Sequence, residues 1–206
     1  MIRKVRRMSK LSKKENKKEN KNESKEIAER DAPFRIKALI MGLFFGAVAL
    51  LIVLAEIHFP IPGVNVVTDP RESFTTVGAA FSGPIGGIII GIFAGIAEPG
   101  GIALASLLAH ITGAVFMGFV YKKIIYARLK GFLRFLGWIG AVLIYYYVFA
   151  ITGFAVGLSI FYKDPTPILQ SYASLAKGVI PELILTCIVT SLVWFALPKK
   201  YRKPLW

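Results

Sequence analysis

The sequence predicts an all-α integral membrane protein, a bundle of about six transmembrane helices. Of its 206 residues, 55% are hydrophobic and only 18% are charged, and the mean hydropathy is +0.59. Water-soluble domains carry about 25% charged residues, so lipid is the predicted solvent. Apolar runs close to the ~20 residues that an α-helix needs to cross a bilayer recur along the chain, at 36–57, 74–97, 102–121, 135–160 and 173–197.

Residues 1–34 are predicted to be a disordered basic cytoplasmic tail. The first 30 residues hold 12 Lys/Arg and 5 Asp/Glu and have few apolar side chains to bury. No aromatic residue interleaves the lysines as a stacking platform for nucleic acid would need, so we expect the tail to lie near anionic lipid headgroups instead. The remaining domains are a transmembrane helical domain, 35–198, and a basic cytoplasmic C-terminus, 199–206.

The number of membrane crossings follows from the positive charges. Clusters of Lys/Arg mark the cytoplasmic side, and there are three of them: the tail, Lys122–Arg134 and Lys199–Lys203. Five simple spans would place either the tail or both later clusters outside the cell. All three clusters lie inside, with both termini cytoplasmic in the cell membrane, only if 58–101 contributes zero or two crossings.

A break at Gly83-Pro84 can supply the two crossings. Proline removes a backbone donor and clashes with the preceding turn, so we expect Glu72–Ser82 to descend and Ile85–Ala97 to return. Eleven helical residues reach only ~16 Å, which leaves two short spans or a re-entrant hairpin. The alternative is a single span kinked at Pro84, which would violate the positive-inside rule.

Three outward loops follow from this topology. They carry Arg71 and Lys163 as their only Lys/Arg. The first is long and rich in proline, so it is predicted to be either a lid over a site or a plain connector. The three loops are 58–73, 98–101 and about 161–172.

Several segments together resemble the substrate-binding S component of an energy-coupling-factor transporter, a family of small six-helix membrane proteins that capture vitamins. The first helix has small residues four apart at Ala38, Gly42 and Gly46 and precedes a proline-bearing loop. The glycine-rich phrase 78–96 follows. The runs 106–124 and 180–200 are similar to the family's fourth and last helices.

The resemblance implies uptake of a vitamin-like small molecule from outside the cell. It implies a pocket formed by the first outer loop and the outer halves of helices four to six. It also implies a transmembrane coupling protein and ATPase subunits as partners, with the Ala38, Gly42 and Gly46 face as the docking candidate. No GxxxxGK[ST] phosphate loop occurs in this sequence, so ATP hydrolysis is assigned to those partners.

A second resemblance keeps another function open. Residues 69–87 are about as similar to the five-helix sensor module of some bacterial histidine kinases, in which an Asp-x-Arg pattern (here Asp69 and Arg71) precedes the glycines. A membrane sensing or structural module without transport activity is therefore the alternative. No kinase domain follows in this sequence, which favours the transport interpretation.

Ionisable residues within membrane spans are costly and therefore indicate function. Glu182 shares a helix face with Thr186 and could accept hydrogen bonds from a ligand amine or amide. It could instead be protonated, pair with Lys177, or bind backbone freed by Pro181. His110 is predicted either to contact ligand or to be a hydrogen-bonded packing histidine.

Two weaker candidates complete the predicted substrate site. Glu98 lies beside the expected pocket mouth. Tyr146 belongs to three consecutive mid-span tyrosines, Tyr145–Tyr147, of which at least one must face the interior and could stack on a heterocycle.

Other glycines and the absence of catalytic motifs complete the prediction. Gly83, Gly87, Gly91 and Gly95 lie four apart, which predicts close helix packing inside the protein or a docking face.

A single cysteine and two histidines exclude a disulfide framework and leave little for a metal site. No nucleophile–base arrangement or paired carboxylates appear, so neither an enzyme nor a cofactor is expected.

Overall fold

The computed structural model describes residues 36–57, 59–60, 67–98, 102–163, 165–198, 202–204 and 206. The contacts of the chain divide it into Met1–Ile36 and Lys37–Trp206, and the elements below belong to the second unit apart from Ile36 itself. The predicted tail, 1–34, lies outside the described residues, as do the tip of the first outer loop and part of 199–206. The predicted domain division therefore stays a prediction.

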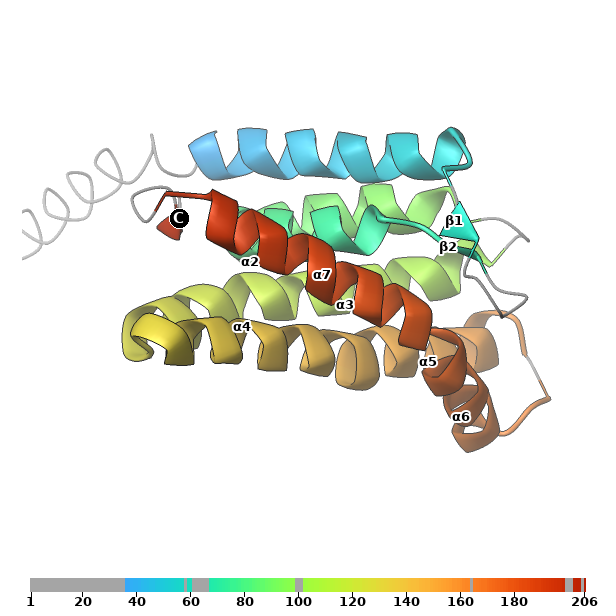
Figure 1. Cartoon of the computed structure of the whole chain (residues 1–206). Helices are drawn as coiled ribbons and strands as arrows, with labels where there is room; N and C mark the ends of the chain where they lie inside the picture. Colours follow the sequence, from blue (N-terminus) through green and yellow to red (C-terminus); the bar gives the residue numbers. More distant parts are fainter. Residues whose placement is uncertain are drawn as a thin grey trace, which may run out of the picture. The chain divides into compact units, whose positions relative to one another are not determined.

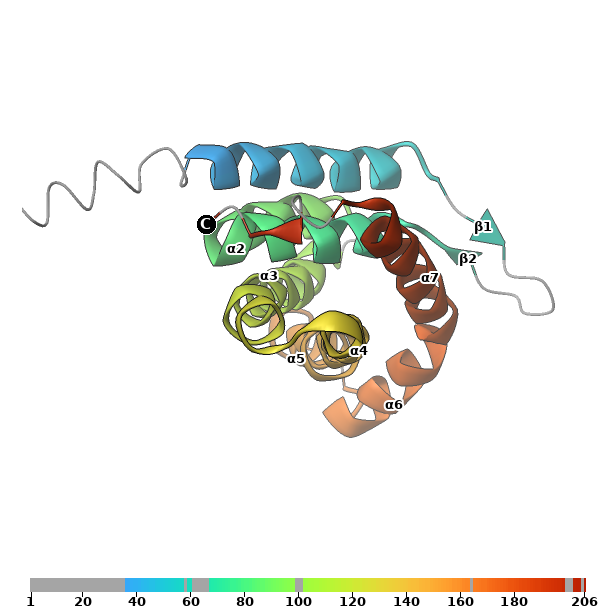
Figure 2. The ribbon, with the colours of Figure 1, turned by 60° about the vertical axis from the view of Figure 1, so that its left-hand side comes forward.

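Helices make up nearly all of the described chain (Figures 1 and 2). A two-residue antiparallel pairing of β1 with β2 closes the first outer loop. The elements in chain order are a first helix Ile36–Leu54, β1 Phe59–Pro60, β2 Val67–Thr68, α2 Arg71–Ile96, α3 Ala103–Val120, η2 Tyr121–Tyr126, α4 Gly131–Ile144, η3 Tyr145–Ala150, α5 Ile151–Phe161, α6 Ile168–Gly178 and α7 Ile180–Ala196.

Four helices among the described residues are long and apolar enough to cross a membrane: Ile36–Leu54, Arg71–Ile96, Ala103–Tyr126 and Gly131–Phe161. The π-helical turn η2 extends α3, and η3 joins α4 to α5. The helices α6 and α7 pass the same test only as a pair, bent by 51°, which is the geometry of a broken span or of a re-entrant loop. In Figure 1, α6 lies at an angle to the long helices, and none of its side chains is fully buried.

The segment α2 is a hairpin of two short helices, because it reverses direction at Gly83. A straight helix would separate residues 71 and 94 by about 34 Å. Instead, the Arg71 guanidinium donates to the Ala94 carbonyl at 3.0 Å. A methyl group at Gly78 would likewise lie 2.9 Å from Ile90 Cδ1. The predicted fold class, about six helices with one short pair around Gly83-Pro84, is confirmed.

Gly83 makes the reversal possible. Its φ of 77° and ψ of −173° fall in a region that is essentially restricted to glycine. Pro84 then begins the returning helix, where its missing N–H costs no hydrogen bond. Gly83 is therefore a turn residue and does not belong to the packing stripe that the four-residue spacing predicted.

The other three glycines of that spacing pack against α3. Methyl groups at Gly87, Gly91 and Gly95 would lie 2.6–2.8 Å from backbone atoms of α3. Such distances are too short for carbon, so the two backbones approach as closely as only glycine allows. Of the two predicted roles for these three glycines, the structure shows internal packing.

One end of the unit gathers basic residues. The Tyr121 hydroxyl donates to the Arg202 carbonyl at 2.5 Å, and Lys122 donates to the Trp206 carbonyl. A methyl group at Gly83 would contact the Trp206 ring. The hairpin turn, the start of the Lys122–Arg134 cluster and the described C-terminal residues thus lie together.

Candidate functional site

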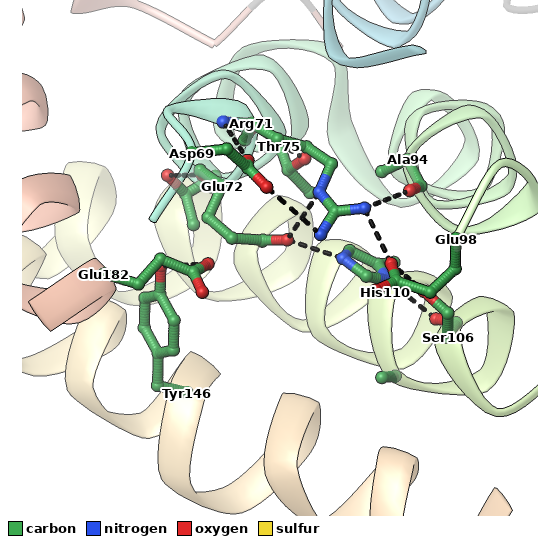
Figure 3. A network of polar contacts seen from close by, with 12 residues as sticks. Asp69, Arg71, Glu72, Thr75, Ala94, Glu98, Ser106, His110, Tyr146 and Glu182 are labelled. Atoms are coloured by element: carbon green, nitrogen blue, oxygen red, sulfur yellow. Dashed lines mark hydrogen bonds and ion pairs between the residues drawn. The ribbon is translucent and has the colours of Figure 1, made fainter. Parts of the chain in front are cut away.

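A network of polar side chains surrounds Arg71 (Figure 3), which begins α2 and so lies at the end of the hairpin opposite the turn at Gly83. Five segments of the chain contribute to it: the start of α2, Glu98 just after the end of α2, α3, η3 and α7. Its members are Asp69, Arg71, Glu72, Ser73, Glu98, Ser106, His110, Tyr145, Tyr146, Glu182 and Thr186.

Arg71 is the cation at the centre of the network, with a side chain only 9% exposed. Its Nη1 donates to Glu98 Oε2 at 2.8 Å and to the Ala94 carbonyl at 3.0 Å. Nη2 lies 3.6 Å from Asp69 Oδ2, and Nε lies 3.7 Å from Glu72 Oε1. Three carboxylates therefore share one guanidinium, which ties the two ends of the α2 hairpin together.

Glu72 and His110 form the second part of the network. His110 Nε2 lies 2.5 Å from Glu72 Oε1, and its Nδ1 donates to the Ser106 carbonyl at 2.7 Å. Because a carbonyl oxygen can only accept, Nδ1 carries a proton, and the hydrogen bond between Nε2 and Oε1 then requires a proton on one of these two atoms. The Tyr145 hydroxyl donates to the other Glu72 oxygen, so both carboxylate oxygens are hydrogen-bonded.

Glu182 and Thr186, both on α7, form the third part. The Tyr146 hydroxyl donates to Glu182 Oε1 at 3.1 Å and lies 2.8 Å from Thr186 Oγ1. Ser73 Oγ lies 3.5 Å from the same threonine oxygen, so this part joins α7 to the start of α2. In Figure 3 the Glu182 carboxylate is on the side of Tyr146 that faces Glu72.

The π-helical turn η3 places both tyrosines in the interior. Tyr145 and Tyr146 are 0% and 2% exposed, whereas Tyr147 is half-buried. A π-turn carries an extra residue per turn and often marks a functional site. Here it points two consecutive hydroxyls at two different carboxylates, Glu72 and Glu182.

Burial determines the direction in which the pKa of Asp69, the first residue of the network, is shifted. Asp69 lies before α2, outside the membrane-spanning helices, and burial raises its pKa above the ordinary value although Arg71 opposes the change. Among the described residues, no three His, Cys, Asp or Glu side chains are placed to hold a metal ion. The arrangement suits hydrogen bonding and ion pairing to a small molecule.

The structure brings together the five residues predicted to bind substrate, which are Glu182, His110, Glu98, Tyr146 and Thr186. Their contact with a ligand stays a prediction. Of the packing alternatives, His110 is hydrogen-bonded within the chain, and Glu182 contacts Tyr146.

The residues predicted to dock a partner lie elsewhere. Ala38 is buried, and a methyl group at Gly42 would lie 2.8 Å from Gly86 Cα. A methyl group at Gly46 would meet the Phe93 ring. This stripe faces α2 within the chain, and its predicted contact with a coupling protein stays a prediction.

Sequence reasoning missed Glu72 and the central role of Arg71. Arg71 was placed in the first outer loop, but it begins α2 and is buried because its guanidinium neutralises carboxylates from both ends of the hairpin. The consecutive ionisable residues Arg71 and Glu72, directly before a glycine-rich apolar run, were the signal available.

The fold is similar to that in the crystal structure, at 2.1 Å, of the S-component for biotin from an ECF-type ABC transporter. The TM-score is 0.51 with 18% sequence identity, and the match covers 77% of this chain and 89% of that chain. No family model and no curated protein matches the sequence. The chain thus has the fold of an integral membrane S-component, as the sequence resemblance predicted.

Proposed function

We propose that this protein captures a vitamin-like small molecule at the outer side of the cell membrane, as the substrate-binding component of an uptake transporter. A transmembrane coupling protein and ATPase subunits would supply the energy for release inward. The similarity of the fold to a biotin S-component supports this proposal.

One observation carries it: ionisable side chains are concentrated in the interior of an otherwise apolar bundle. Arg71, Glu72 and His110 are each at most 8% exposed. Such residues are rare in membrane spans because a charge there costs roughly 2.5–3.5 kcal/mol or more, and those present mark ligand or ion sites. Simple packing would be served as well by apolar residues at lower cost.

The charge distribution supports the orientation. The described parts of the basic clusters lie at the end opposite the network, and Lys/Arg clusters favour the cytoplasm. The network then lies toward the outer side, where a molecule for uptake would arrive.

Binding is tested by native mass spectrometry of the detergent-purified protein. We expect a small molecule to co-purify with the native chain and to be lost from Glu182→Ala, while the melting temperature measured without ligand stays close to that of the native chain. Lys177→Ala, a change at an exposed residue of α6, is the control and should retain the molecule. Undiminished occupancy in Glu182→Ala would remove Glu182 from the site.

Orientation is tested separately by labelling engineered cysteines. In a Cys187→Ser background, Lys130→Cys and Lys163→Cys place single thiols at exposed positions at opposite ends. An impermeant maleimide applied to intact cells should label position 163 and should label position 130 only after lysis. The reverse pattern would place the network on the cytoplasmic side and contradict uptake from outside.

A further inference from the structure

We propose that the molecule bound by this network is an organic cation, with its positive charge held by the carboxylate of Glu182. This inference rests on the proposed function and adds the chemical class of the ligand. It follows from the count of charges, from their pairing and from one unsatisfied buried nitrogen.

The network holds more acidic than basic groups. Four carboxyl groups, those of Asp69, Glu72, Glu98 and Glu182, face one guanidinium and one imidazole. With all four carboxyl groups ionised and the imidazole protonated, the network carries a net charge of −2. Glu72 is buried, and Asp69, Glu98 and Glu182 are half-buried, so an excess of negative charge here is costly until an opposite charge compensates it.

The pairing shows which carboxylate lacks a cation. Arg71 contacts Asp69, Glu72 and Glu98, and His110 contacts Glu72. Within the described ranges Glu182 has no cation within salt-bridge distance, and its partner there is the neutral Tyr146 hydroxyl. The predicted alternative pairing with Lys177 is not seen, because no salt bridge among the described residues joins Lys177 to Glu182.

A buried nitrogen provides the independent observation. In the part of the chain that the structure describes, Arg71 Nε is shielded from solvent and has no hydrogen-bond partner, because 3.7 Å to Glu72 is too long for a hydrogen bond. A buried donor without a partner is rare and needs an explanation, and an acceptor atom of a bound molecule, reached when the guanidinium shifts on binding, supplies one. On this explanation, the bound cation also carries an oxygen or nitrogen acceptor.

An organic cation that also carries an acceptor atom would supply both missing partners, a cation for Glu182 and an acceptor for Arg71 Nε. Its cationic nitrogen would pair with Glu182 beside the Tyr146 hydroxyl, and its acceptor atom would approach Arg71. An anionic ligand would add to the existing excess and would have to compete with three carboxylates for Arg71.

The test identifies the charge of the molecule released from purified protein. The protein is denatured and the released small molecules are analysed by liquid chromatography with mass spectrometry. We expect a molecule that is cationic at pH 7, at least tenfold depleted in Glu182→Gln and retained in the matched control Glu56→Gln, whose side chain is exposed.

Each failure has a distinct meaning. A released molecule that is neutral or anionic overturns the cation assignment and leaves the proposed capture function standing. Equal retention of a cation in Glu182→Gln overturns the role of Glu182. No released molecule from the native chain counts against the proposed function, and with it against this inference.

A second variant tests the charge excess without any ligand. Glu182→Lys supplies a cation from the chain itself, so the ligand-free variant should melt at a higher temperature than ligand-free Glu182→Ala and should retain no molecule. A melting temperature at or below that of Glu182→Ala overturns the argument from charge.

Discussion

The contact between α2 and α3 permits a quantitative prediction at Gly91. A methyl group at this position would lie 2.6 Å from Cα and 2.7 Å from N of Ile111. Ordinary carbon contacts begin at about 3.4 Å, so Gly91→Ala must move the two backbones apart by about 0.8 Å. Forcing extra volume into a packed interior costs about 1–3 kcal/mol, and backbone atoms cannot rotate out of the way as a side chain can.

A matched control isolates this cost. Gly140 also lies within a helix, α4, but a methyl group there meets nothing within 4 Å. The gain in helix propensity on replacing glycine by alanine is common to both sites, so the difference between the variants measures the clash.

The assay is reversible unfolding in mixed micelles with increasing sodium dodecyl sulfate, followed by circular dichroism. Gly91→Ala should unfold with a free energy about 1–3 kcal/mol lower than that of Gly140→Ala. Equal unfolding free energies for the two variants would refute the close approach of the α2 and α3 backbones.

Three more predictions concern the turn and the network. Gly83→Ala should lower the unfolding free energy by about 1–3 kcal/mol, because its backbone conformation strains any side chain. Glu72→Ala should lower the unfolding free energy by about 3–5 kcal/mol, since it leaves Arg71 and His110 without a buried carboxylate partner. Because burial raises the pKa of Asp69, its proton binds the folded state more tightly than the unfolded state, so this residue's contribution to stability should fall as pH rises from its ordinary pKa through the raised one.

The same unfolding assay checks the first two, and melting temperatures across pH 4–8 check the third. Native-like stability of Gly83→Ala would contradict the reversal at that residue. A loss in Glu72→Ala no larger than in Gly140→Ala would mean that the buried pairs contribute nothing. A pH dependence unchanged in Asp69→Asn would exclude Asp69 as its source.

The α2 reversal was predictable because two independent constraints coincide at Gly83-Pro84. Proline and glycine disfavour a continuous helix there, and the Lys122–Arg134 cluster requires an even number of crossings before it. Composition alone does not find this turn, since the whole segment Arg71–Ile96 is apolar enough to pass for one long span.

The sequence indicates several residues of the network, but it does not indicate which of them contact each other. Glu182 and His110 stand out as ionisable residues within apolar runs. Their partners do not, because Glu72 and His110 are 38 residues apart and meet only once the hairpin has packed against α3. The two inward tyrosines depend on a π-turn, for which the sequence carries no simple signal.

The folded-back α2 also constrains how the chain can be built during synthesis. Its halves span only about 18–20 Å each, less than the ~30 Å of hydrocarbon, and the backbone at the reversal is not a regular helix. Lipid cannot satisfy such backbone, which is stable at membrane depth only among protein neighbours. The hairpin is therefore stable at membrane depth only once the first helix and Ala103–Tyr126, which pack against it, are also in the bilayer.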